Sequence, residues 1–98
     1  MALQITNNYG ILEIQGDIKG TNVKSLKHHF EHLLQHKDQI VLSLESVKKI
    51  DISGVSTLTK LHKKAMSLNK IFYIIGKNNK AINKAFGKNS YVLRNDYL

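Results

Sequence analysis

A carboxylate, a hydroxyl and a glycine lie together in the segment Asp51-Ile52-Ser53-Gly54. The segment comes directly before an apolar pattern of helical spacing, which predicts that Ser53, or in competition Asp51, caps a helix. Satisfying a free backbone N–H is by itself a sufficient role for a serine at that place. A helix start also suits a phosphate, because free N–H groups and the positive end of the helix dipole point at it. The cluster therefore fits either a structural cap or a phosphorylation site at Ser53.

Phosphorylation of Ser53 would change the charge of any surface that includes Asp51. A phosphoserine carries about −1.5 to −2 charges at neutral pH, and an unpaired charge forced into an interface costs about 3–5 kcal/mol. Reversing a binding equilibrium from 1:99 to 99:1 requires about 5.5 kcal/mol. One phosphate at the centre of a protein interface is thus of the right size for an on/off switch.

A row of histidines is the second group that could do chemistry. His28, His32 and His36 are four residues apart, with His29 beside the first, and imidazoles at this spacing can share a metal ion. Helical geometry places them opposite the apolar face of their predicted helix, and no carboxylate completes a ligand set. We expect no specific metal site and no cofactor. Weak adventitious binding of zinc or nickel and a pH-sensitive surface patch remain open.

The positive charge of the chain is concentrated in its C-terminal part. The net charge is +8, yet basic and acidic residues balance up to residue 59, and from Lys60 onward eight lysines and Arg94 face only Asp96. This asymmetry attracts acidic partners, whether protein, nucleic acid or membrane surface. Nucleic acid is the less favoured partner, because Phe72 and Tyr73 lie in a predicted buried strand, Phe86 falls on a predicted core stripe, and tryptophan is absent.

Composition and motifs exclude several other functions. The chain has no cysteine, which rules out disulfides and thiolate catalysis. Ser53 lacks a G-x-S-x-G setting and no glycine-rich nucleotide fingerprint follows a strand, so we expect no enzymatic activity. The apolar runs are too short to cross a bilayer, and the N-terminus lacks the features of a signal peptide. We expect one cytoplasmic domain over residues 1–98, without membrane insertion.

Apolar spacing predicts the elements that must position these residues. A hairpin is expected from strands at residues 3–5 and 11–14, joined by the turn-rich segment 7–10. After a loop at 16–20, Thr21 or Asn22 is expected to cap a helix that runs to about His36. Further elements are a buried strand at 40–44 in the middle of the sheet, a connector at 45–49, a buried strand at 71–75, helices at 54–68 and 77–86, and an edge strand at 91–93. Gly87 is expected to end the last helix. The apolar positions expected on the three helices are Val23, Leu26, Phe30, Leu33, Leu34, Val55, Leu58, Leu61, Ala65, Leu68, Ala81, Ile82, Ala85 and Phe86. The order predicts an α/β fold with a mixed sheet of four to five strands, an N-terminal hairpin and three helices.

This order of elements, together with the segment I-D-I-S-G-V-S-T-L at residues 50–58, resembles the STAS domain, the fold of bacterial anti-sigma factor antagonists. The resemblance covers residues 3–93. It implies that Ser53 is phosphorylated by a partner kinase of the GHKL type, which is also the anti-sigma factor, and that phosphorylation ends the interaction. A PP2C-type phosphatase would reset the switch.

The resemblance also implies a partner-binding surface around Ser53. We expect it to contain Lys19, Asp51, Ile52, Ser53, Gly54, Ser56, Thr57 and Lys60. Gly54 is expected to let a partner approach the helix start, and the helix at 55–68 to serve as the recognition surface. For Lys19, which departs from the family pattern, two alternatives stay open: it approaches the cluster and pairs with Asp51 or with a phosphate on Ser53, or the chain has lost the phosphorylation cycle and is a fixed binding module.

Three positions of the chain depart from the family pattern. Ile52 occupies the place of the motif's first hydroxyl residue, Ser43 the place of an aspartate or asparagine, and Lys19 the place of a common acidic residue. Two alternatives to the switch therefore stay open. One is an unphosphorylated STAS subunit of a larger assembly, such as a lipid-transport ATPase complex. The other is nucleic-acid binding through the basic half.

Overall fold

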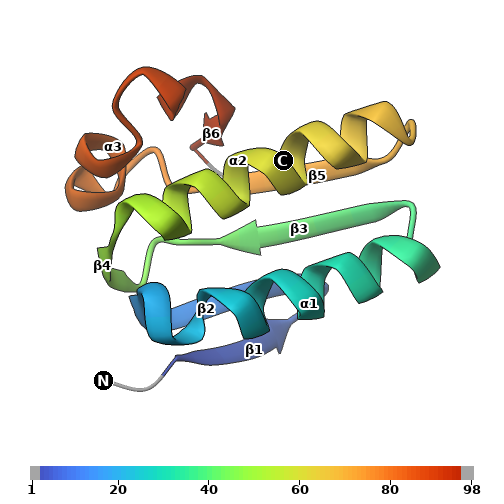
Figure 1. Cartoon of the computed structure of the whole chain (residues 1–98), viewed down its shortest axis with the longest axis horizontal. Coiled ribbons are helices and arrows are strands. Elements are labelled where there is room, and N and C mark those ends of the chain that lie inside the picture. The colour runs from blue at the N-terminus through green and yellow to red at the C-terminus, as the bar shows by residue number, and fades with distance from the viewer. Residues whose placement is uncertain (1–2, 96–98) are drawn as a thin grey trace.

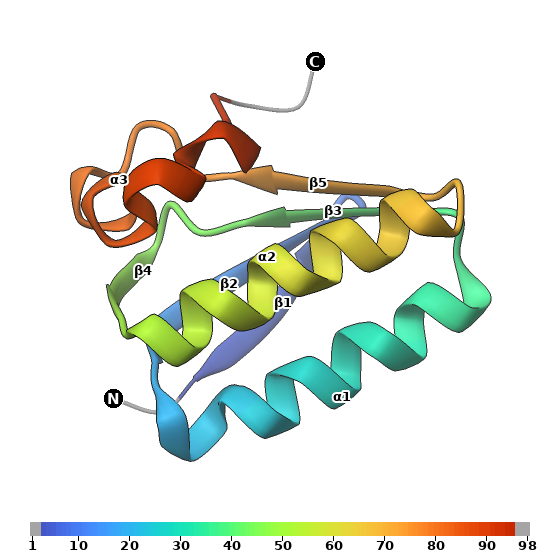
Figure 2. The ribbon, with the colours of Figure 1, turned by 45° about the horizontal axis from the view of Figure 1, so that its top comes forward.

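The structure is a computed structural model, and it describes residues 3–95. In this part of the chain six strands form a mixed sheet, and the two long helices α1 and α2 lie side by side on one face of it (Figures 1 and 2). The elements in chain order are β1 (Gln4–Asn8), β2 (Ile11–Ile18), α1 (Gly20–His36), β3 (Gln39–Ser43), β4 (Val47–Ile50), α2 (Ile52–Ser67), β5 (Ile71–Ile75), α3 (Lys80–Phe86), the 3₁₀ helix η1 (Gly87–Val92) and β6 (Leu93–Arg94).

The sheet has the predicted α/β topology. Strands follow the order β1-β2-β3-β5-β6, with β1 antiparallel to β2 and the other neighbours parallel. The N-terminal hairpin, the three helices and the central place of β3 are confirmed. Within residues 3–95 no helix combines the length and the apolar character needed to cross a membrane.

Strand β4 was not predicted, because the segment 45–49 was expected to be a connector. It pairs in parallel with the second half of β2, beyond the stretch where β2 pairs with β3. The register of β2 shifts between Gly16 and Asp17, and Gly16 has a φ of 101°, which glycine adopts without a steric penalty. This bulge gives β2 two successive partners. The loop expected at 16–20 is therefore mostly strand.

The core lies between the sheet and the helices. Most predicted apolar positions of the two long helices are buried, but Leu33 is only half-buried and Leu68, which follows α2, is 48% exposed. The Phe30 and Phe72 rings meet edge to face with centroids 5.7 Å apart. A fully buried side chain of this size contributes about 1.5–3 kcal/mol to the free energy of unfolding. The buried residues that α1 and α2 supply are Val23, Leu26, Phe30, Leu34, Val55, Leu58, Leu61 and Ala65.

Helix α3 is shorter than the predicted helix at 77–86 and buries a narrower face. Ile82 and Phe86 are buried, but Ala81 and Ala85, which were expected in the same apolar stripe, are exposed. Gly87 ends the helix as predicted. The strand expected at 91–93 is largely replaced by η1, so that only Leu93 and Arg94 pair with β5.

An asparagine fastens α3 to the connection between β3 and β4. Asn79 caps α3 by accepting a hydrogen bond from the Ile82 N–H at 3.2 Å. Its side-chain amide nitrogen donates to the backbone oxygens of Leu44 at 3.0 Å and Val47 at 2.9 Å. Because β4 leads directly into α2, this contact sets α3 beside the start of α2 (Figure 1).

Candidate functional site

The residues of the predicted cluster meet where α1 and α2 both begin. In both ribbon views the two helix starts lie at the same end of the molecule, next to β4 and on the same side as α3 (Figures 1 and 2). The backbone N–H of Asp51 donates to the carbonyl oxygen of Ile18 at 3.0 Å, which ties the end of β4 to the end of β2. Four elements therefore converge on Asp51.

Asp51 caps α2, which decides between the two predicted candidates. Its Oδ1 atom accepts hydrogen bonds from the Gly54 N–H at 2.9 Å and from the Ser53 hydroxyl at 2.7 Å. Its Oδ2 atom accepts from the N–H of Gly20, the first residue of α1, at 2.9 Å. The prediction of Ser53 as the cap is wrong. Asp51 satisfies donors of both helices, while Ser53 is the second helical residue and keeps an exposed side chain.

These hydrogen bonds favour the ionised form of Asp51. The contact with the Ser53 hydroxyl is the largest of the causes that hold the pKa of the carboxyl below its ordinary value of 3.8, followed by the Gly54 N–H. Partial desolvation acts in the opposite direction, and the Gly20 N–H lowers the pKa further. Asp51 is thus a fixed negative charge at neutral pH, beside the exposed hydroxyl.

Lys19 lies near the cluster but does not form the expected ion pair with Asp51. Among the described residues 3–95, the link between this region and the carboxylate is the N–H of Gly20. Lys19 is the N-cap of α1, and its backbone N–H donates to Asn22 Oδ1 at 3.0 Å. The expectation that Thr21 or Asn22 is the N-cap is therefore wrong. Asn22 assists the start of α1 from the third helical position.

Gly54 has a different role from the one expected. It is buried, and a Cβ atom at this position would lie 2.7 Å from Ile18 Cγ2 and 2.8 Å from Ile50 Cγ1. Real Cβ atoms essentially never approach other atoms so closely. The glycine lets α2 pack closely against the ends of β2 and β4, so packing within the domain, rather than the approach of a partner, requires it.

The exposed side of the cluster borders a hollow of about 450 Å³. Ile50, Asp51, Ile52 and Ser53 line it together with Ala85 of α3. Ile52, the first residue of α2, is 87% exposed although it is a large hydrophobic side chain. Ala85 was assigned to the core from its spacing, so the pattern could not indicate its place in this hollow.

The other predicted partner-binding residues lie further along α2, on two sides of the helix. Half-buried Ser56 lines a second hollow of about 270 Å³, which Ile52, Lys60 and Asn89 also border. Thr57 lines a third hollow of about 250 Å³ between α1 and α2. Lys60 borders both the second and the third hollow, so the structure brings these residues onto one continuous surface.

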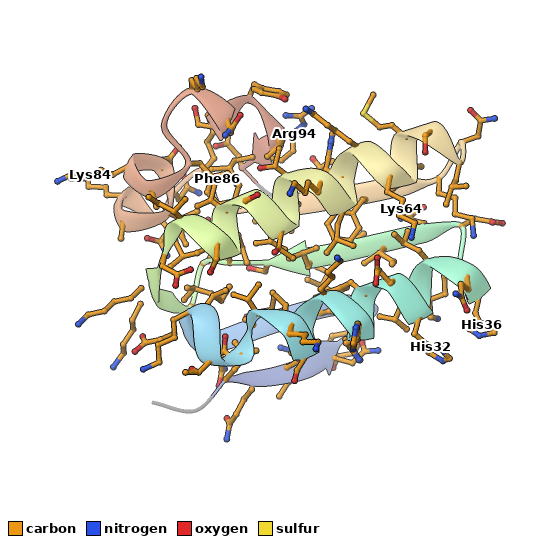
Figure 3. The ribbon with its side chains drawn as sticks, viewed as in Figure 1. His32, His36, Lys64, Lys84, Phe86 and Arg94 are labelled. Atoms are coloured by element: carbon orange, nitrogen blue, oxygen red, sulfur yellow. The ribbon has the colours of Figure 1, made fainter. Side chains whose placement is uncertain are left out.

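The histidine row lies on the outer side of α1, away from this surface. Figure 3 shows His32 and His36 directed away from α2, at the opposite end of the molecule from Lys84. Their rings are neighbours, with centroids 4.7 Å apart. Within residues 3–95 no three histidine or acidic side chains are grouped so that they could hold a metal ion.

The sequence was compared with protein families and the fold with solved structures. The family model described as the STAS domain matches residues 1–86. The chain belongs to the STAS family. No curated protein sequence matches it. This STAS domain shares its fold with the anti-sigma factor antagonist SpoIIAA in its unphosphorylated form, at 12% identity and a TM-score of 0.70 over 98% of this chain and 90% of that one. It is also similar to an anti-sigma factor antagonist from Mycobacterium paratuberculosis, at 13% identity and a TM-score of 0.68 over 97% of this chain and 86% of that one.

Proposed function

We propose that this STAS domain is a non-enzymatic protein-interaction switch of the anti-sigma factor antagonist kind. It binds a kinase or anti-sigma partner through the surface around Ser53 and is released when Ser53 is phosphorylated. The observation that carries the proposal is the exposed hydroxyl of Ser53, held 2.7 Å from a fixed carboxylate oxygen at the rim of the hollow beside Ile52. The likeness in fold to antagonists such as SpoIIAA supports it.

The geometry explains how a phosphate would act on binding while leaving the fold intact. The Ser53 side chain is exposed and fills no part of the core, so a phosphate displaces no buried group. The positive end of the α2 dipole offsets part of the charge of a phosphate on Ser53. The phosphate would replace the hydrogen bond to Asp51 by a repulsion, and together they would present about −2.5 to −3 charges to a bound partner. Burying such a charge unpaired would expel the partner.

Two experiments test the switch: phosphorylation of Ser53 by a kinase, and the variant Ser53→Asp, which adds a negative charge without a kinase. Co-expression with the serine kinases of the host organism, followed by intact-mass measurement, is expected to show one added phosphate, which the Ser53→Ala variant lacks. In a binding assay with the partner, Ser53→Asp is expected to weaken affinity by about 100-fold or more, as a charge left unpaired in an interface does.

Ser25 provides the matched control for the binding assay, since it is an exposed serine on α1 and lines none of the three hollows described above. Ser25→Asp adds the same charge and is expected to leave affinity unchanged. Absence of any phosphate on the wild type, together with unchanged binding by Ser53→Asp, would refute the switch. A Ser53→Ala protein that keeps every function in the cell would instead favour the unphosphorylated subunit of a larger assembly.

A further inference from the structure

Ile52 stands out from the exposed surface of α2. At 87% exposure it projects between the first hollow, which it shares with Ser53, and the second hollow, which it shares with Ser56. Its side chain adds nothing to the core, and covering it with a partner would remove its apolar surface from water.

Lysines continue the surface from Ile52 along α2. Lys60 and Lys63 are exposed and border the second hollow. Lys60 also borders the third hollow, together with Lys27 and Lys64. Lys64 is paired with Glu31 at 3.4 Å, but within residues 3–95 no ion pair within 4.0 Å involves Lys60 or Lys63. The surface thus has an apolar end at Ile52 and a positive end at Lys60 and Lys63.

We infer that Ile52 is the apolar anchor of partner binding, and that the partner is a protein offering an apolar socket for Ile52 bordered by carboxylates that face Lys60 and Lys63. This inference rests on the proposed function, because it specifies the partner chemistry of the same surface. Complementary charges orient the partner and raise the association rate, whereas burial of Ile52 lowers the dissociation rate.

A protein suits this surface better than a nucleic acid or an anionic membrane. Both of those would bring rows of phosphates, and the fixed carboxylate of Asp51 lies directly beside Ile52, where it would repel them. Ser53 lines the first hollow beside Asp51, and Ser56 lines the second hollow together with Lys60 and Lys63. One large apolar side chain bordered by polar groups matches the apolar core and polar rim of a protein interface.

The partner is first identified by photo-crosslinking from the anchor position in the full chain. A photoreactive amino acid replaces Ile52 in one variant and Met66 in another, and crosslinked products from the host cell are identified by mass spectrometry. Met66 is the control because it is also an exposed hydrophobic residue of α2, at 63%, but lies in its last turn. We expect one acidic protein at position 52 and none in common with position 66.

The purified partner is then used to measure affinity and rates. Removing an isoleucine from an apolar socket by Ile52→Ser is expected to weaken binding about 10- to 100-fold, mainly through faster dissociation. Met66→Ser is expected to change affinity less than about twofold, as exposed residues outside an interface do. The double variant Lys60→Gln/Lys63→Gln is expected to slow association and to reduce its dependence on salt.

Several outcomes would overturn the inference. It fails if the crosslinks from position 52 are to nucleic acid or lipid, if no protein is crosslinked, or if Ile52→Ser binds as the wild type does. Measuring both variants, Ser53→Asp and Ile52→Ser, against the same partner distinguishes failure of this inference from failure of the proposed function. If Ser53→Asp does not change the affinity for the partner while Ile52→Ser weakens it, the switch is wrong and the role of Ile52 as anchor stands. If Ser53→Asp releases the partner while Ile52→Ser does not, the reverse holds.

Discussion

Helices α1 and α2 begin side by side, yet their first turns are built in different ways. The start of α2 has its own acidic cap, Asp51, and a buried glycine, Gly54, that packs against Ile18 and Ile50. The start of α1 has Lys19 at the capping position, without a side-chain hydrogen bond to the helix of the kind that Asp51 makes. Its first N–H, that of Gly20, is satisfied by Asp51 instead.

The difference shows that one carboxylate serves two helices. Asp51 holds Ser53 in place, caps α2 and fixes the entry of α1, so it has a structural role whether or not a partner binds. Ser53 has little such role, because its side chain is exposed and its hydroxyl contacts only the cap. The fold therefore depends on the carboxylate of Asp51 more than on the hydroxyl beside it.

The two glycines at these helix starts give the sharpest test of the comparison. A Cβ at Gly54 would lie 2.7 Å from Ile18 Cγ2, whereas a Cβ at Gly20 would have Asp51 Oδ2 at 4.0 Å as its nearest neighbour. Gly54→Ala is therefore expected to lower the free energy of unfolding by about 1–3 kcal/mol through overpacking. Gly20→Ala is expected to raise it by about 0.4–1 kcal/mol, because alanine reduces the entropy of the unfolded chain. Urea unfolding of both variants measures these effects, and equal changes would contradict the difference between the two starts.

Acid titration tests whether the charge of Asp51 stabilises the fold, and its effect on stability is expected to be smaller than that of Gly54→Ala. The folded-state pKa of Asp51 is lowered below the ordinary value of 3.8, so its contribution to stability is present at higher pH and is lost as pH falls through the lowered pKa. Asp51→Asn cannot ionise, and it should unfold at lower urea concentration than the wild type at about pH 7. This gap should narrow below about pH 4. A gap that is constant across the pH range would show that the charge of Asp51 does not contribute.

Ser53→Ala is expected to have the smallest effect. Its exposed hydroxyl donates one hydrogen bond to Asp51, which caps α2 through the Gly54 N–H without it. The free energy of unfolding should therefore change by no more than about 0.5 kcal/mol. Replacing a serine that caps a helix by alanine would instead lower the free energy of unfolding by about 0.5–2 kcal/mol. Urea unfolding distinguishes the two roles, and a loss in the upper part of that range would mean that Ser53 is needed for the fold.

Most of the fold could be predicted because most of its signals are local. Helical spacing of apolar residues locates α1, where the pattern is Val23, Leu26, Phe30 and Leu34. Continuous apolar runs locate the strands β3 and β5. β4 escaped prediction because Lys48 and Lys49 interrupt its apolar pattern, and its pairing depends on the bulge at Gly16, far away in sequence. Ala85 escaped for a related reason, since spacing indicates an apolar side chain but not whether anything covers it.

The candidate site divides in the same way. The sequence by itself determined that a carboxylate, an isoleucine and a hydroxyl stand at the start of a helix, because their order in the chain fixes their positions there. Only the tertiary structure decided that Asp51 is the cap, that it also satisfies Gly20 of α1, and that Gly54 is required by packing. The cap itself is a local contact between Asp51 and Gly54, so the sequence could offer it only as one of two candidates. The bond to Gly20 and the packing of Gly54 against Ile18 join segments more than thirty residues apart, and local patterns carry no information about such contacts.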